Sequence, residues 1–151
     1  MTEQVPLTIR TPNADDKDAW EALWRAYLTF YETSVSADVY EWTWAQIQGE
    51  KDAMHARLAF VGDTPVGLVP FLYHRTFWGP DQRCYLNDLF TTPDARGRGV
   101  AQGLIEAVYD HARAAGSTQV YWLTAEDNLR ARALYDRVAK KTPFIKYTEQ
   151  M

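Results

Sequence analysis

Cysteine is almost absent from this 151-residue chain, and so are several other features that would mark a particular class of protein. The single cysteine, Cys84, excludes an internal disulfide framework and fits a reducing compartment. The longest apolar run, residues 66–73, is much too short to cross a bilayer. The N-terminal MTEQVPLT has neither the basic flank nor the apolar core of a secretory signal peptide. We therefore expect a cytoplasmic protein with no membrane segment.

An excess of positive charge is also lacking. The formal net charge is −4, whereas a nucleic-acid partner would require a basic field. The three histidines, His55, His74 and His111, fall on different predicted elements without the spacing of metal ligands, so no metal site is predicted. Repeats, low-complexity tracts and linkers are absent too. Residues 1–151 are therefore expected to form one domain.

Hydrophobic periodicity predicts alternating strands and helices. The expected strands are Leu7–Arg10, Arg57–Val61 paired with Val66–Thr76 as an antiparallel hairpin, Leu86–Thr92, Val120–Thr124 and a last short strand at Phe144–Tyr147. Four helices are expected. The first follows the turn at residues 11–13, and the second lies within residues 34–49. The third begins at Val100 and ends before Gly116, and the fourth begins at a cap formed by Asn128.

Aromatic residues are concentrated between residues 20 and 44. Some follow the apolar face of the first helix and are expected to be core residues: Trp20, Trp24 and Tyr27. The others exceed what one helical face can bury, and they are expected to line a pocket for an ammonium group or an apolar chain: Tyr31, Tyr40, Trp42 and Trp44.

The most informative stretch, Tyr85 to Gly103, reads YLNDLFTTPDARGRGVAQG. A strand is followed by a loop with two glycines, which can adopt positive φ and come close to a ligand. The helix that follows presents free backbone N–H groups and the positive end of its dipole, which suits a phosphate or pyrophosphate. Arg96 and Arg98 add two positive charges beside this site.

Three other interpretations of this loop compete with a phosphate site. A tight strand–helix turn with solvated arginines would need no ligand. A dinucleotide fingerprint fails because Gly97, Gly99 and Gly103 are spaced one residue too widely for GxGxxG, and Gln119 and Val120 occupy the place of the ribose-binding acid. A Walker loop fails because the Gly-Lys-Ser/Thr ending is absent.

The stretch resembles motif A of the GNAT superfamily of acyl-CoA-dependent N-acetyltransferases. Their Arg/Gln-x-x-Gly-x-Gly/Ala pattern is met by Arg96, Gly99 and Ala101, and LNDLFTTPDARGRGVA is close to the form found in polyamine acetyltransferases. In TAEDNLRARALY, Asn128 and Tyr135 match the family's Asn-x(6)-Tyr. The chain is also similar to members that acetylate histone tails or D-amino acids. The resemblance implies an α/β (α+β) GNAT fold, with a mixed, mostly antiparallel central sheet flanked by about four helices.

The resemblance also implies acetyl-CoA as cosubstrate and assigns the residues that bind it. Backbone groups of residues 97–102 would hold the pyrophosphate, residues 89–91 would lie beside the pantetheine arm like an added strand, and Asn128 would hydrogen-bond the pantetheine. A backbone N–H at or near Leu89 would polarise the thioester carbonyl. The expected cofactor-binding residues are Leu89, Phe90, Thr91, Arg96, Gly97, Arg98, Gly99, Val100, Ala101, Gln102 and Asn128.

The catalytic residues are expected to be Tyr135 and Asp88. Tyr135 matches the tyrosine that protonates the departing thiolate in many members, although a core tyrosine is the alternative. Relatives carry a glutamate base where this chain has Leu123 or Asn87. Asp88 or Glu126 would therefore accept the amine proton through water, unless the amine arrives neutral.

The expected function is transfer of an acetyl group from acetyl-CoA to a primary amine by direct attack in a ternary complex. The acceptor would be a polyamine, a diamine, an amino acid or a lysine side chain, and the enzyme is expected to be a homodimer. Residues 1–80 carry 11 acidic and 6 basic side chains while residues 81–151 carry 9 and 10, which fits a polyphosphate cofactor meeting a cationic substrate. The alternative is a non-catalytic acyl-CoA-binding sensor or interaction module.

Overall fold

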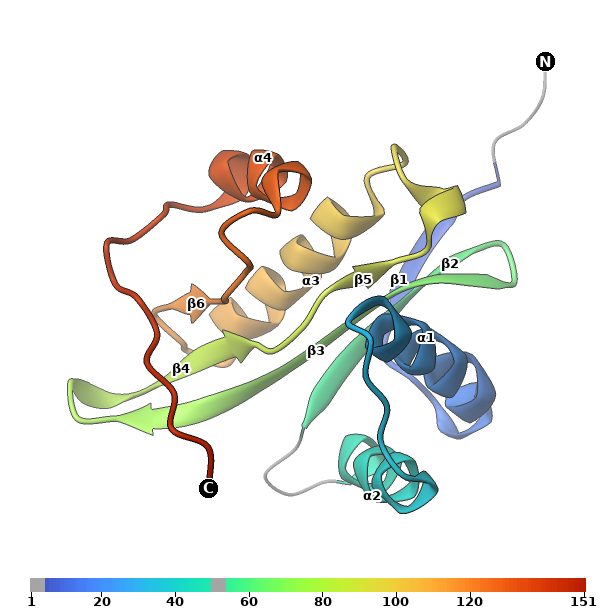
Figure 1. The fold of residues 1–151 in the computed structure, drawn as a ribbon, viewed down its shortest axis with the longest axis horizontal. Helices are drawn as coiled ribbons and strands as arrows, with labels where there is room; N and C mark the ends of the chain where they lie inside the picture. Colours follow the sequence, from blue (N-terminus) through green and yellow to red (C-terminus); the bar gives the residue numbers. More distant parts are fainter. Residues whose placement is uncertain (1–4, 50–53) are drawn as a thin grey trace.

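A mixed β-sheet forms the centre of the computed structural model, which describes residues 5–49 and 54–151 (Figure 1). Four strands pair antiparallel in the order β1-β2-β3-β4, β6 pairs parallel with β4, and β5 pairs antiparallel with β3. The strands are β1 (Leu7–Arg10), β2 (His55–Val61), β3 (Thr64–Thr76), β4 (Gly79–Leu86), β5 (Phe90–Thr91) and β6 (Val120–Tyr121). Residues 1–4, within the stretch examined for a signal peptide, lie outside the described residues.

Helices cover both faces of this sheet. They are α1 (Lys17–Phe30), α2 (Ala37–Gln48), α3 (Val100–Ala114) and α4 (Leu129–Val138), with short 3-10 turns η1 (Ala14–Asp16) and η2 (Pro93–Ala95). The helices α1 and α2 pack against one face, α3 packs against the other, and α4 lies beside α3 (Figure 1). The predicted fold class, with its mostly antiparallel sheet and four flanking helices, is confirmed.

The core beneath α3 is largely aliphatic. Leu104, Ile105 and Val108 of α3 are fully buried against Val69 of β3. The close approach of helix and strand depends on Gly67, because a Cβ atom there would lie 2.8 Å from Val100 Cγ1 and 2.9 Å from Leu104 Cδ1. This packing fixes the N-terminus of α3 against the sheet.

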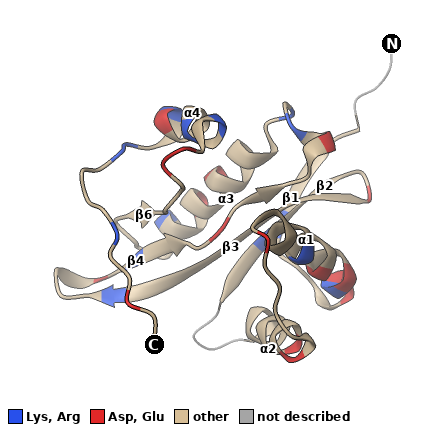
Figure 2. Cartoon of the chain, in the orientation of Figure 1, with Lys and Arg blue, Asp and Glu red and all other residues tan. Residues whose placement is uncertain are grey.

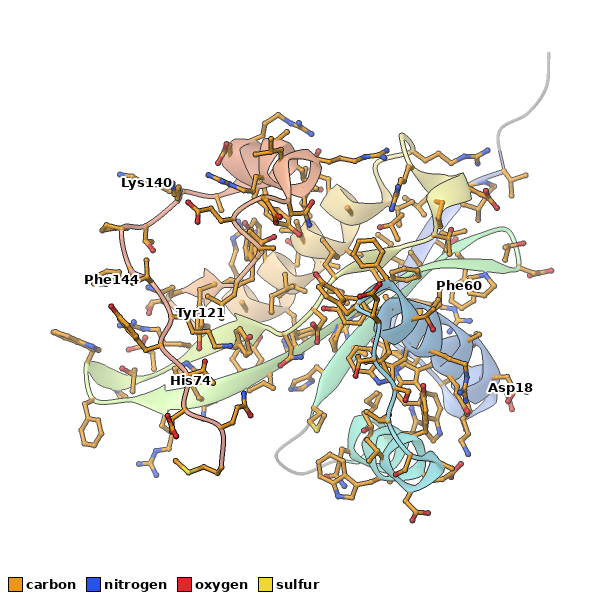
Figure 3. All side chains as sticks on the ribbon, viewed as in Figure 1. Asp18, Phe60, His74, Tyr121, Lys140 and Phe144 are labelled. Carbon is orange, nitrogen blue, oxygen red and sulfur yellow. The ribbon has the colours of Figure 1, made fainter. Side chains whose placement is uncertain are left out.

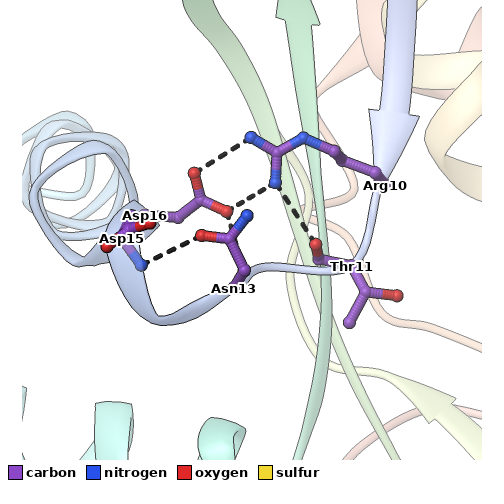
Figure 4. Close-up of polar contacts among 5 residues, drawn as sticks. All are labelled: Arg10, Thr11, Asn13, Asp15 and Asp16. Carbon is purple, nitrogen blue, oxygen red and sulfur yellow. Dashed lines mark hydrogen bonds and ion pairs between the residues drawn. The ribbon is translucent and has the colours of Figure 1, made fainter.

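The core beneath α1 and α2 is richer in aromatic side chains, including Trp20, Tyr40 and Phe60. An ion pair secures the start of α1: Arg10 donates to the Asp16 carboxylate at 2.5 and 3.0 Å (Figure 4). Asp16 also accepts from the backbone N–H of Asn13 at 2.8 Å, which completes a capping box. The hydrogen bond from Arg10, followed by that from Asn13, lowers the pKa of Asp16 against the opposing effect of burial.

Three strand predictions differ from the structure. The extended segment Leu86–Thr92 is interrupted, because β4 ends at Leu86 and β5 begins only at Phe90. The strand at Val120–Thr124 ends at Tyr121. The strand at Phe144–Tyr147 is wrong: this segment has no regular structure, pairs with no strand in the described parts of the chain, and exposes its apolar side chains.

Within residues 5–49 and 54–151, every helix is too short or too polar to cross a bilayer. The same residues contain no cluster of three or more His, Cys, Asp or Glu side chains that could hold a metal ion.

Candidate active site

A cavity of about 450 Å³ lies where β4 and β6 diverge. These strands pair only at Cys84–Val120 and Tyr85–Tyr121, after which the chain leaves β6 toward α4 (Figure 1). Beyond them, β5 pairs with β3 on one side, and none of the described strands pairs with its other edge. The volume is within the range of small-molecule sites. Four segments therefore converge on one cavity: the end of α1, residues 86–91, residues 95–102 and residues 122–137.

One side of the cavity, here called the backbone wall, consists of residues 96–102. Gly97 and Gly99 have φ values of 85° and 75°, so the prediction of positive φ in this loop is confirmed. Gly99 is the N-cap of α3, and its carbonyl accepts the N–H of Gly103 at 2.9 Å. The N–H groups of Val100, Ala101 and Gln102 therefore have no acceptor within the helix. They form a row of donors at the positive end of a 15-residue helix.

Positive charge predominates around the cavity. Arg96, Arg130 and Arg137 line it, whereas Asp88 is the one acidic side chain among the described residues that do so. Figure 2 shows basic residues on the loop before α3 and on α4, with acidic residues beside them, and further acidic residues on α1 and α2. The acidic charge of residues 1–80 is therefore largely remote from the cavity. Arg98 is exposed and does not line it.

Asn128 and Tyr135 face the cavity from α4. Asn128 caps this helix as predicted, with its side-chain oxygen accepting the N–H of Ala131 at 3.4 Å. Tyr135 is half-buried, and its ring packs edge-on against Trp122 at a centroid distance of 5.4 Å. Burial and, secondarily, the nearby Tyr31 raise the pKa of Tyr135, so its hydroxyl keeps its proton at neutral pH.

Asp88 lies in the irregular segment between β4 and β5. Its carboxylate accepts hydrogen bonds from the Tyr27 hydroxyl and from the Asn87 side-chain amide. Burial raises the pKa of Asp88 above that of an ordinary aspartate, and the two hydrogen bonds act in the opposite direction. An aspartate with a raised pKa binds a proton more readily than a solvated one, as a general base requires.

Backbone groups at the free edge of β5 also point toward the cavity. Thr92 donates its N–H to the carbonyl of Val66 at 2.9 Å, so Thr92 and Phe90 direct their polar groups toward β3. Because these groups alternate along a strand, those of Thr91 point to the opposite edge.

All of the predicted site residues except Arg98 line this cavity. The sequence does not indicate the contributions of Phe30, Arg130 and Arg137, and it predicts Tyr27 as a core residue. Tyr27 follows the apolar period of α1, so periodicity alone gave no signal for its polar role. Glu126, the other candidate base, is exposed and does not line the cavity.

Of the aromatic residues expected to line a pocket, only Tyr31 does so. Tyr40 is buried beside Trp20, and the ring of Trp44 lies 5.4 Å from that of Trp20. Trp42 is 57% exposed and lies apart from the cavity. The prediction failed for Tyr40 and Trp44 because α2 supplies a second apolar face, which packs with α1 and takes up more rings than one helix could bury. Trp42 points to solvent instead.

Residues 17–139 match the sequence model described as the Acetyltransferase (GNAT) family. The chain is 35% identical over 143 residues to the D-amino-acid N-acetyltransferase HPA3 of Saccharomyces cerevisiae, covering 93% of this chain and 89% of that protein. It is 34% identical over 89 residues to the thialysine N-epsilon-acetyltransferase of Caenorhabditis elegans, covering 59% of this chain and 55% of that protein.

The fold is also similar to that of solved structures. The aminoglycoside N-acetyltransferase AAC(6')-Iy in complex with CoA superposes with a TM-score of 0.85 at 18% identity, covering 99% of this chain and 98% of that one. At this level of identity the similarity concerns the fold alone.

Proposed function

The chain belongs to the GNAT acetyltransferase family, and we propose that it transfers the acetyl group of acetyl-CoA to a primary amine by direct attack in a ternary complex. The observation that carries this proposal is the cavity itself. It combines a helix N-terminus suited to pyrophosphate with a protonated tyrosine and a carboxylate of raised pKa. We propose that residues 1–151 act as one catalytic domain.

Acetyl-CoA would lie along the backbone wall and the free edge of β5. The N–H groups of residues 97–102 would hold the pyrophosphate, and Arg96, Arg130 and Arg137 would add positive charge. The edge of residues 89–91 would pair with the pantetheine arm as a strand does, and Asn128 would hydrogen-bond it from α4. Arg98 would act on the phosphates through its field, because its side chain lies outside the cavity.

The transfer requires two proton movements. As the amine nitrogen bonds to the acetyl carbon, Asp88 accepts the proton that the nitrogen loses, directly or through water. The N–H of Leu89 stabilises the negative charge on the carbonyl oxygen. As the carbon–sulfur bond breaks, the Tyr135 hydroxyl donates its proton to the sulfur, and the protonated Asp88 and the tyrosinate are reset by exchange with solvent.

The acceptor would be a small primary amine: a polyamine, a diamine, an amino acid or a lysine side chain. The two relatives are named for D-amino acids and thialysine, both of which carry an amine. Because Asp88 is the one acidic side chain lining the described cavity, it would be the main attraction for a cationic acceptor. We expect amines with a net positive charge to be better substrates than neutral ones.

Release of CoA from acetyl-CoA over a panel of amines tests this proposal. The panel should include polyamines, diamines, both enantiomers of several amino acids, and a lysine peptide. Turnover with at least one primary amine is expected. Binding of acetyl-CoA without CoA release for any amine would instead indicate the non-catalytic module.

We also propose that the enzyme is a cytoplasmic homodimer. Phe77 and Trp78 at the tip of the β3–β4 hairpin are almost fully exposed. Phe144 and Tyr147 in the C-terminal segment, which follows α4 (Figure 3), are 86% and 90% exposed. A second copy covering these side chains would remove large apolar surfaces from water. Sedimentation equilibrium should give a dimer mass, and a monomer at micromolar concentration would contradict the proposal.

A further inference from the structure

A hydrogen bond joins α1 to the proposed base across a large separation in sequence. The hydroxyl of Tyr27 donates to Asp88 Oδ1, and the amide of the adjacent Asn87 donates to Asp88 Oδ2. Both carboxylate oxygens are therefore held, one of them by a residue 61 positions away in the chain.

Packing fixes the ring that carries this hydroxyl. Tyr27 stacks on Trp24 at a centroid distance of 5.2 Å with 13° between the planes. It also contacts Tyr31 at 5.0 Å, and Phe90 of β5 edge-on at 6.2 Å. Because these contacts leave the side chain little freedom, the hydroxyl is positioned before any substrate arrives.

The protonation of both partners gives the contact a chemical consequence. Burial, followed by the hydrogen bond and charge of Asp88, raises the pKa of Tyr27, so the phenol remains a donor at every pH relevant to the reaction. A donor stabilises the ionised form of a carboxylate more than the protonated form. Removing the hydroxyl would leave the half-buried Asp88 with only the Asn87 hydrogen bond, which would raise the pKa of Asp88 further.

Other groups near Asp88 are candidates for the same influence. Tyr85 lies beside it on β4, and the remaining titratable or charged groups that line the cavity are Tyr31, Arg96, Arg130, Tyr135 and Arg137. Among the described residues, only Tyr27 and Asn87 hydrogen-bond the carboxylate.

We propose that Tyr27 is a positioning residue that orients Asp88 and keeps its carboxylate ionised and ready to accept the amine proton. This inference rests on the proposed function, in which Asp88 is that acceptor. In this view α1 contributes to proton transfer as well as to the core, and Tyr27 acts only through Asp88.

A double-mutant cycle tests the proposal, using the parent, Tyr27→Phe, Asp88→Asn and the combined variant. Tyr40→Phe is the matched control, because it removes a hydroxyl from the same aromatic cluster at a residue remote from Asp88. Tyr27→Phe is expected to lower kcat by about tenfold, as befits loss of a hydrogen bond to a charged group. It should also move the acidic limb of the kcat profile to higher pH while leaving the acetyl-CoA Kd unchanged. In the Asp88→Asn background, Tyr27→Phe should have no further effect.

A second measurement does not depend on turnover. NMR titration of the Asp88 carboxyl carbon should give a higher pKa in Tyr27→Phe than in the parent and in Tyr40→Phe. An unchanged Asp88 pKa, or an equal loss of kcat with and without Asp88, would show that Tyr27 serves packing alone and would overturn the inference. Failure of the proposed function can be told apart from failure of this inference. In the first case the parent would release no CoA with any amine, and the NMR titration would still show whether Tyr27 affects the pKa of Asp88.

Discussion

The two sides of the cavity are built from different parts of the chain. The backbone wall is one continuous segment, residues 96–102, and offers N–H groups and the end of a helix dipole. A second set of lining residues, here called the side-chain wall, consists of Tyr27, Asp88 and Tyr135, which come from α1, the β4–β5 junction and α4. The backbone wall is suited to binding the phosphates of a cofactor, and the side-chain wall is suited to proton transfers. Changes in the two walls should therefore have separable effects on binding and on turnover.

Gly99→Glu should have the largest effect, on binding alone. It places a like charge where the pyrophosphate is expected and a side chain at a φ of 75°. Like charges in contact cost several kcal/mol, which corresponds to a loss of acetyl-CoA affinity of about 100-fold or more. Isothermal titration calorimetry measures the change.

Gly116→Glu is the matched control for this substitution. Gly116 has the same φ of 75°, and an added Cβ meets nothing within 4 Å at either position, but Gly116 lies at the opposite end of α3. An equal loss of affinity in the two variants would attribute the effect to strain and remove the backbone wall from cofactor binding.

Tyr135→Phe should lower kcat by about 100-fold while leaving the acetyl-CoA Kd nearly unchanged, because it removes a general acid and retains the ring. Single-turnover kinetics with calorimetry separates the two quantities. Tyr121→Phe is the control, because the hydroxyl of Tyr121 hydrogen-bonds His74 and lies outside the cavity (Figure 3). If kcat does not change although chemistry limits the rate, Tyr135 belongs to the core.

The backbone wall is local in the sequence and the side-chain wall is not, and this difference explains which parts of the site could be predicted. The backbone wall was predictable down to the positive φ of Gly97 and Gly99, because a local pattern encodes a local conformation. Asn128 was predictable as a cap for the same reason. The Tyr27–Asp88 contact was not, since it joins segments 61 residues apart and Tyr27 fits the apolar period of its helix.

The errors in the strands have a related cause. Apolar residues at 144–147 satisfy the local preference for a strand, but a strand also needs a neighbouring edge, and propensity does not report one. The short β6 shows the converse. Trp122 and Leu123 suit a strand, yet the chain turns away from β4 and so opens the cavity.

Asp16→Asn should lower the free energy of unfolding, because Asp16 holds the start of α1 in place. The effect should be smaller than those of the two substitutions above. Loss of the charge that pairs with Arg10, together with a weaker capping box, is expected to cost about 1–2 kcal/mol, or roughly 2–8 °C in Tm. Because the folded-state pKa of Asp16 is lowered, its contribution is present above the ordinary aspartate pKa and is lost as pH falls through the lowered value. Asp18→Asn, at an exposed position in the same helix (Figure 3), should leave Tm nearly unchanged. Equal Tm values for the two variants would contradict this account.

The smallest effect is expected from a histidine pair between β2 and the last turn of α3. The rings of His55 and His111 lie 4.7 Å apart, and Tyr73 hydrogen-bonds His111 Nδ1 at 2.6 Å. Burial lowers the pKa of both histidines. The nearby His111 lowers the pKa of His55 further, and the positive charge of Arg57 lowers the pKa of both. Their stabilising contribution is thus complete above about pH 6.5, the unfolded value, and is lost as pH falls toward the lowered folded values.

Replacement of one ring should reduce this acid sensitivity. Thermal unfolding of His111→Gln between about pH 7.5 and 5 should show a shallower fall in Tm than the parent. The exposed His74→Gln should follow the parent. A parent Tm that is independent of pH across this window would show that the pair does not couple protonation to folding.

A crystal structure of the enzyme with CoA tests the division between the two walls most directly. We predict that the pyrophosphate oxygens accept hydrogen bonds from the N–H groups of residues 97–102. We also predict that the sulfur lies within hydrogen-bonding distance of the Tyr135 hydroxyl, with Asp88 still held by Tyr27. A pyrophosphate bound away from the start of α3, or a sulfur out of reach of Tyr135, would contradict the account.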